Sequence, residues 1–456
     1  MPRILLLAAL LVMCTGCFSD DSDTDSAPAR ASSADCEAAE GAPATLPAGQ
    51  RLAWAEGARL WTLTEDCPAP QLRSEHDRDI GRIRWSPNGE SIAFHDGRGT
   101  TVLRLDAGSS PRSFGSEEFA WLGNDRVVIG RSRLVEAGAT LVVVHVASGE
   151  ERVIDGALAF AAEGESIAYW KDAGACPPEV LPQDLRKEGG TPIGRRCPRL
   201  AILPPGATDP SLTVDVTEML AVMPDGVPSL GLTSPGSIDW SPDREWIIFK
   251  MCGIAASGCV DTQHVFELHV GSGVLTYVGD TAGPIAWAPD SSSYVYVQSG
   301  GRPYDAYPRP MVVRRPGGLG DGDTISPSGV EDWQPAWSPD ASAVVFTSFP
   351  SMRLGDCQVC APEVPEEGIW TASLEARTQL TSSPEWVDSS PRWSGDGEWI
   401  LFVRNGPEHE SAGYPKTQLW IMRSDGSDQR MVLDLSGAGP HSFPLDYLYD
   451  WWTPPD

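Results

Sequence analysis

The sequence predicts an all-β fold, a β-propeller of eight four-stranded blades, with seven blades as the alternative. Two observations predict it: a short turn phrase recurs five times, and each copy is followed within a few residues by an apolar triplet. The phrases have the form Trp-Ser-Pro-Asp or a close variant and begin at Trp85, Trp240, Trp287, Trp337 and Trp393. A repeat of about 40–50 residues with several short strands is typical of propellers.

Each phrase has the chemistry of a tight turn between two strands. Proline fixes the φ of the first central residue, Asp or Asn bonds to nearby backbone, and Gly accepts the conformation that follows. The triplets, such as Ile92-Ala93-Phe94 and Ile400-Leu401-Phe402, do not alternate apolar with polar residues. Such a run indicates a strand covered on both faces, as in blades stacked around a ring.

Three weaker copies begin at Trp121, Phe160 and Trp452 and bring the number of blades to eight. The long gap between residues 160 and 240 leaves seven blades open, and unrelated hairpins in a sandwich are the other alternative. The copy at Trp452 has no second strand after it, whereas 51–54 and 60–63 resemble the second and third strands of a blade without a first. We therefore expect the C-terminal strand to complete the N-terminal blade, which removes an exposed sheet edge.

The Trp-Ser-Pro-Asp-Gly turn followed by Ile-Ala-Phe resembles the WD-like repeats of TolB-like propellers, over roughly residues 51–456. The resemblance implies a periplasmic or surface protein that binds or scaffolds. Related propellers also form the non-catalytic half of some peptidases, but this sequence has no appended hydrolase domain and no Gly-x-Ser-x-Gly elbow. The resemblance does not fix the number of blades.

The N-terminus predicts export and a lipid anchor. Arg3 precedes ten apolar residues, too few to span a bilayer and typical of a signal peptide. The following Cys14-Thr15-Gly16-Cys17 resembles a bacterial lipobox with Cys17 as the lipidated residue; an ordinary cleaved signal is the alternative. Residues 1–16 would then be the signal peptide. Residues 17–50, acidic and poor in large apolar residues, would be a disordered tether. Phe18 after the cysteine favours the outer membrane.

The composition limits the partners of the exported protein. The formal net charge is −29, which argues against nucleic acid and anionic lipid headgroups as ligands. A solvated acidic surface is the plainer interpretation, and a preference for cationic partners is the other. We expect a monomer that meets the membrane only through its lipid.

Cysteine usage predicts disulfides. With Cys14 removed and Cys17 lipidated, eight cysteines remain, an even number in an oxidising compartment. We expect sequence neighbours to pair: Cys36 with Cys67, Cys176 with Cys197, Cys252 with Cys259 and Cys357 with Cys360. The last pair forms a Cys-x-x-Cys motif, for which a redox or metal-binding role is the alternative.

All long insertions follow the apolar triplets and so join the second strand of a blade to the third. Because strand direction alternates, these connections share one face, which we call the insertion face; the Ser-Pro-Asp turns lie on the opposite turn face. The insertions are Lys171–Pro198, Met251–His264, Gln298–Pro310, Thr347–Gly368 and Arg404–Thr417. Loops on a rigid scaffold commonly bind ligands, although loops also lengthen by drift. A Cys36–Cys67 disulfide would attach the tether to the turn face.

Four acidic residues precede Trp anchors by five or six positions, and we expect them at the mouth of the central channel: Asp79, Asp332, Asp388 and Asp446. Converging carboxylates suit Ca²⁺ or a basic side chain; a capped turn or a solvated rim is the alternative. His95, His264 and His409 lie in or beside connections between second and third strands on the insertion face, as a metal-dependent lyase on a propeller requires. Their blades are well separated, so we expect no shared metal, and no other cofactor.

These patterns together predict a lipid-anchored, non-catalytic binding or scaffolding protein of the bacterial cell envelope. Its loop-rich face would meet a protein, peptide or glycan, in the outer membrane facing the periplasm or the cell surface. The alternative is a propeller-based lyase or hydrolase acting on polysaccharide or peptide. No nucleophile–base pattern, metal motif or phosphate loop favours it, although propeller sites assemble from distant blades. A structural envelope component without a small ligand is a third possibility.

Overall fold

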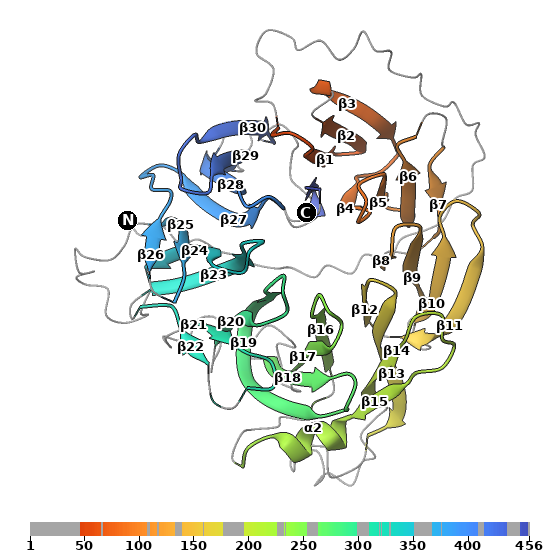
Figure 1. Ribbon diagram of the computed structural model, residues 1–456. Coiled ribbons are helices and arrows are strands. Elements are labelled where there is room, and N and C mark those ends of the chain that lie inside the picture. Colours follow the sequence, from red (N-terminus) through yellow and green to blue (C-terminus); the bar gives the residue numbers. More distant parts are fainter. Residues whose placement is uncertain are drawn as a thin grey trace.

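The computed structural model is an all-β protein whose antiparallel sheets stand around a ring (Figure 1). It describes residues 46–454 except 65–66, 107–109, 116–117, 133–138, 158, 177–195, 226–231, 233, 253–262, 299–309, 319, 321, 328–329, 351–366, 375, 409–414 and 436–446. The predicted signal peptide, Cys17, Cys36 and nearly all of the predicted tether lie outside this part of the chain.

Blades 1–4 are separate four-stranded sheets, in which the strands follow one another from the inner to the outer edge. Blade 1 consists of β31 (Tyr449–Trp452), β1 (Arg51–Glu56), β2 (Arg59–Thr64) and β3 (Cys67–Glu75). Blade 2 consists of β4 (Gly81–Trp85), β5 (Ser91–His95), β6 (Thr100–Arg104) and β7 (Arg112–Ser113). Blade 3 consists of β8 (Glu118–Leu122), β9 (Arg126–Ser132), β10 (Ala139–His145) and β11 (Glu151–Ala157). Blade 4 consists of β12 (Ala159–Glu163), β13 (Ser166–Ala175), β14 (Arg196–Leu203) and β15 (Leu212–Asp215).

Blades 5 and 6 share one long strand, β19 (Leu275–Trp287), and together form a seven-stranded sheet. The first half of β19 is the outer strand of blade 5, after β16 (Ser234–Trp240), β17 (Trp246–Cys252) and β18 (Gln263–His269). Its second half is the inner strand of blade 6, before β20 (Tyr294–Gln298), β21 (Met311–Arg314) and β22 (Asp323–Thr324).

Blades 7 and 8 again follow the regular order. Blade 7 consists of β23 (Val330–Trp337), β24 (Val344–Pro350), β25 (Gly368–Ala372) and β26 (Arg377–Gln379). Blade 8 consists of β27 (Val387–Trp393), β28 (Trp399–Glu408), β29 (Pro415–Arg423) and β30 (Arg430–Asp434). The described strands therefore form eight blades, and both weak copies at Trp121 and Phe160 belong to blades of their own.

The recurring phrase forms the predicted turn between the first and second strands. In blade 7 the Ser338 hydroxyl donates to Asp340 Oδ1 (2.6 Å) and accepts from the amide of Ala343 (3.0 Å). The same serine bonds recur at Ser86, Ser241 and Ser394. The triplets after the turns are buried, and Ile92, Ala93 and Phe94 are all 0 % exposed. The prediction of strands covered on both faces is confirmed.

The tryptophan before each turn also has a role between blades. In four of the eight blades its indole N–H donates to an inner-strand carbonyl of the preceding blade, at 3.0–3.3 Å. The pairs are Trp85 with Asp450, Trp121 with Arg84, Trp287 with Asp239 and Trp337 with Ala286. Each acceptor is the residue just before the preceding blade's own anchor.

The ring closes as the sequence predicts, with one change of register. β31 pairs antiparallel with β1, so the C-terminal strand completes blade 1. Trp451 lies opposite Leu52, as Trp85 lies opposite Ile92 in blade 2, so the anchor of blade 1 is Trp451 and not Trp452. Trp452 instead contacts the first turn of blade 2, where its indole donates to the carbonyl of Pro87 (3.0 Å).

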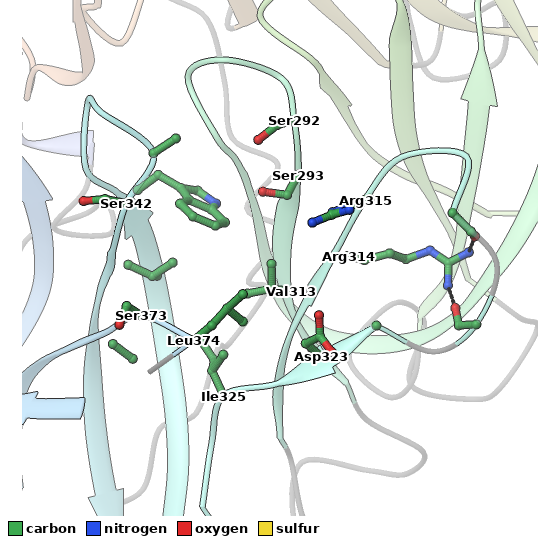
Figure 2. Close-up of a pocket in the computed structure, with 17 residues that line it drawn as sticks. Ser292, Ser293, Val313, Arg314, Arg315, Asp323, Ile325, Ser342, Ser373 and Leu374 are labelled. Carbon is green, nitrogen blue, oxygen red and sulfur yellow. Dashed lines mark hydrogen bonds between the residues drawn. The ribbon is translucent and has the colours of Figure 1, made fainter. Parts of the chain in front are cut away.

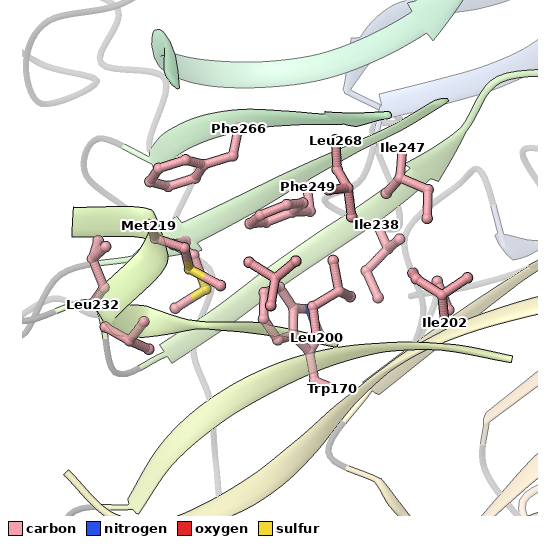
Figure 3. Packing of buried hydrophobic residues seen from close by; sticks show 14 of the residues in the cluster. Trp170, Leu200, Ile202, Met219, Leu232, Ile238, Ile247, Phe249, Phe266 and Leu268 are labelled. Carbon is pink, nitrogen blue, oxygen red and sulfur yellow. The ribbon is translucent and has the colours of Figure 1, made fainter. Parts of the chain in front are cut away.

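The long gap between the copies at 160 and 240 contains a helix that the sequence analysis did not predict. Helix α2 (Val216–Val222) joins blade 4 to blade 5, and its Met219 is fully buried. Figure 3 shows Met219 packed in one cluster with Trp170 of blade 4 and Phe249 of blade 5. Among the described residues there is no helix with the length and apolar composition needed to span a bilayer.

Candidate functional site

The strand order places all five predicted insertions between the second and third strands of blades 4–8. A sixth connection, 133–138, occupies the same place in blade 3 and is as long as the one in blade 8, 409–414. Blades 1 and 2 have tight turns there instead, at 57–58 and 96–99. The insertion face is therefore elaborated over six consecutive blades. Most inserted residues, His409 among them, lie outside the described residues.

One disulfide joins two strands at the base of the blade 4 insertion. Cys176 follows β13 and is bonded to Cys197 on β14, 21 residues later, which is the neighbour pairing expected from the sequence. Cys252, at the end of β17, and Cys67, at the start of β3, are also disulfide-bonded. Their partners, like the predicted Cys36, Cys259, Cys357 and Cys360, lie outside the described residues.

Two of the four predicted channel carboxylates are buried in ion pairs with arginine. Asp332 is 0 % exposed, and its two oxygens accept from Arg377 at 2.7 and 2.8 Å. Asp388 is 2 % exposed and binds Arg404 in the same bidentate way at 2.6 and 2.8 Å. A carboxylate already neutralised by a guanidinium is not an available ligand for a cation. The expectation that these two residues form an open acidic mouth is wrong.

The other two predicted carboxylates do not join them. Asp79 is exposed and lies beside Gly57, in the tight turn of blade 1. Asp446 lies outside the described residues. Within the described residues, no three His, Cys, Asp or Glu side chains are grouped so that they could hold a metal ion.

A histidine–aspartate–tyrosine cluster lies at the base of the blade 5 insertion. His264 on β18 is 5 % exposed, and its Nδ1 lies 2.7 Å from Oδ1 of Asp280 on β19. The hydroxyl of Tyr277 donates to the same oxygen at 2.7 Å. Burial and the neighbouring Asp280 raise the pKa of Tyr277, so it stays a neutral donor. The carboxylate fixes the imidazole through Nδ1, and no described residue bonds to Nε2 of His264.

Blade 2 has a comparable cluster around its tight turn. Asp96, 5 % exposed, accepts from the Thr101 hydroxyl (2.8 Å) and lies 3.3 Å from Nδ1 of His76. Burial opposes ionisation of Asp96, but hydrogen bonds from His76, Thr101 and the amide of Arg98 outweigh it and hold its pKa below the usual value. His95 lies beside this turn, and its Nδ1 accepts from the amide of Gly97 (3.3 Å).

The turn face carries two clefts that the sequence analysis missed. The larger, about 980 Å³, lies between blades 6 and 7 (Figure 2). The smaller, about 460 Å³, lies between blades 7 and 8, beside the turns at Asp340 and Asp396. Their walls come from turns of two different blades, so no contiguous motif marks them. The only signal in the sequence is Arg314-Arg315 before the glycine-rich segment 317–322.

Comparison with known proteins supports the β-propeller fold and indicates no particular function. No family model and no curated protein matches this chain. Solved structures do: one titled "Crystal structure of the eukaryotic initiation factor" has a TM-score of 0.53 and 11 % identity, covering 91 % of this chain and 90 % of that one. The dihydro-heme d1 dehydrogenase NirN has a TM-score of 0.50 and 12 % identity, covering 86 % and 76 %.

A putative TolB from Agrobacterium tumefaciens is a more distant match, with a TM-score of 0.32 and 13 % identity, covering 84 % of this chain and 88 % of that one. Structural similarity to TolB-like and other β-propellers is thus present but distant. Because the similar structures include both enzymes and proteins of other kinds, they indicate a β-propeller and no particular activity.

Proposed function

We propose that this chain is a lipid-anchored, non-catalytic binding or scaffolding protein of the bacterial cell envelope. Its insertion face meets a protein, peptide or glycan. The observation that carries the proposal is the position of the insertions, which occupy the same connection in six consecutive blades. Segments that vary above a fixed scaffold are where propellers and other rigid folds usually bind ligands.

The scaffold beneath the insertions supports this role because buried ion pairs and a disulfide fix its strand ends. The Asp332–Arg377 and Asp388–Arg404 pairs lie below the insertions of blades 7 and 8, and the Cys176–Cys197 disulfide closes the one in blade 4. A rigid base lowers the ordering cost that a loop pays on binding.

The lipobox-like Cys14-Thr15-Gly16-Cys17 supports an anchor at the N-terminus. Cys67 begins the fourth strand of blade 1, after a connection on the turn face. A Cys36–Cys67 disulfide would hold the tether there and direct the insertion face away from the membrane. Replacing Cys17 by Ser should move the protein from the membrane fraction to the soluble fraction.

A site-specific crosslinking experiment tests the binding face. A photo-crosslinking amino acid is placed in blade 8 at Glu385, before β27 on the insertion face, and in a second variant at Asp396, in the turn on the opposite face. Both positions are exposed. In intact cells we expect one dominant crosslinked partner from the Glu385 variant. The Asp396 variant should not crosslink to that partner. An identical pattern from both positions would contradict the proposal, and a stoichiometric transition metal in the purified protein would favour the enzyme instead.

A further inference from the structure

The cleft between blades 6 and 7 has the size and lining of a ligand site. Its volume of about 980 Å³ lies near the upper end of the range typical of small-molecule pockets. Apolar side chains from both blades line it, including Val313, Ile325, Trp337 and Val344. Figure 2 shows Ser342 and Ser373 of blade 7 on one side, and Arg315 and Asp323 of blade 6 on the other.

A buried network holds the blade 6 wall in place. Glu267 of β18 is 0 % exposed and accepts from the amide of Gly317 (2.6 Å) and from the hydroxyl of Tyr294 (3.0 Å). Arg314 is also buried, lies 3.9 Å from Glu267, and donates to the carbonyls of Gly318 and Gly320. One carboxylate and one guanidinium thus fix both the start and the middle of the 315–322 connection.

The glycines of this connection are required by close packing as well as by conformation. Gly317 has a φ of +68°, and a Cβ there would lie 2.9 Å from the Trp246 ring. Gly322 has a φ of +86°, and its Cβ would lie 2.6 Å from the carbonyl oxygen of Val313. At these two described positions the backbone conformation is therefore set before any ligand arrives.

The two adjacent arginines differ in what they contact. Arg314 is buried and bonds to the carbonyls of the wall, whereas Arg315 is exposed. Arg315 is exposed, lines the cleft, and forms no ion pair with a described residue. In a chain of net charge −29, a guanidinium above an apolar floor is a local site for an anion. The hydroxyls of Ser293, Ser342 and Ser373 border the same cleft. That of Ser342 already donates to Asp340 Oδ1 (2.8 Å), and that of Ser373 accepts from the amide of Ala376 (3.1 Å). The oxygens of Ser293 and Ser342 can still accept from the N–H groups of a peptide, and an acyl chain has no such groups.

We propose that this cleft binds the free C-terminal carboxylate of a peptide whose last residue is apolar. Arg315 pairs with the carboxylate, and the floor formed by Val313, Ile325 and Trp337 accepts the terminal side chain. Capture of a chain end by cationic and backbone groups is a recurring mode of peptide recognition. The site lies on the turn face, so it is independent of the function proposed for the insertion face.

The test uses a fluorescently labelled pentapeptide, Gly-Ser-Gly-Phe-Leu, with a free carboxylate, titrated with the purified full propeller and followed by fluorescence anisotropy. We expect saturable binding that weakens at least tenfold when the peptide C-terminus is amidated, because a charge-assisted pair is lost. Arg315→Gln should weaken it at least tenfold as well. Arg104→Gln, at the end of the third strand of blade 2 on the same face, should leave it unchanged.

Any of three results would overturn the assignment. The peptide could fail to bind saturably even at millimolar protein, the peptide with a free carboxylate and its amidated form could bind equally well, or the Arg315→Gln variant could bind the peptide as tightly as the parent. Octanoate is added as a competitor to separate the two sources of a carboxylate on an apolar stem. Weak competition supports the peptide, whereas displacement by octanoate at the affinity of the peptide shows that the site takes an acyl chain.

Discussion

The turns between the first and second strands allow a direct test of what a non-glycine residue costs at a position where the backbone is left-handed. The fifth residue of the phrase adopts the left-handed conformation in every strong copy. It is glycine at Gly89 and Gly397, with a φ of 68° at both, but it is Arg244, Ser291 and Ala341 in blades 5–7, with φ values of 66°, 60° and 57°. An L-residue pays a steric cost for this conformation that glycine does not.

Ala341→Gly should therefore stabilise the protein. Relief of the left-handed conformation is worth about 1–2 kcal/mol, and the greater freedom of glycine in the unfolded chain offsets about 0.4–1 kcal/mol of it. The expected net gain is about 0.5–1 kcal/mol. Gly397→Ala should lower the free energy of unfolding by a similar amount. The left-handed conformation is the only cost there, since the added Cβ would lie 3.6 Å from Pro339 Cδ, an ordinary contact.

Gly89→Ala should cost clearly more than Gly397→Ala. The two glycines have the same φ, but a Cβ at Gly89 would lie 2.6 Å from the Trp452 ring, so it would also push on the strand that closes the ring. Chemical denaturation of the three variants and the parent, with midpoint and slope fitted together, measures these differences. If Ala341→Gly lowers the midpoint at an unchanged slope, the left-handed residue is not a cost and the reasoning fails.

Three further changes have defined outcomes. Asp388→Ala leaves the Arg404 guanidinium buried without its carboxylate and should cost about 3–5 kcal/mol of unfolding free energy; recovery in a double variant with Arg404→Met, measured by denaturation, would identify the stranded charge as the cause. The lowered pKa of Asp96 stabilises the fold above about pH 4, the unfolded value, and this contribution is lost as the pH falls through the lower folded value; the stability difference between parent and Asp96→Asn should therefore shrink below pH 4. Serine at both Cys176 and Cys197 opens a 21-residue loop and should cost about 3 kcal/mol, with proteolysis becoming faster within 177–195; an unchanged cleavage pattern would contradict it.

Local chemistry explains why so much of the ring could be predicted. In the four strong copies that contain it, the serine of the phrase makes its bonds within five residues, so the turn at Ser338 is determined by the sequence around it. Burial of the triplets and completion of blade 1 by β31 follow from the same repeat. The one-residue error at Trp452 arose because two tryptophans are adjacent, and only pairing with Leu52 shows which is the anchor.

Long-range pairing explains what was missed. Asp332 was expected at the channel mouth because its partner, Arg377, is 45 residues away on the outer strand of the blade. The continuous β19 was not predicted, because a chain that passes from the outer strand of one blade to the inner strand of the next without a turn leaves no turn signal to find. The clefts depend on two blades at once, which no single repeat encodes.

The polar clusters below the insertion face suggest why that face tolerates long connections. Blade 2 closes its tight turn with Asp96 and His76, whereas blades 7 and 8 use Asp332 and Asp388 paired with arginine. Each cluster is buried and bonded within its own blade or to an adjacent connection, so the strand ends are fixed before the chain enters an insertion. Breaking one such pair is costly, but lengthening the loop beyond it costs little entropy. The insertions can therefore lengthen while the ring beneath them stays the same.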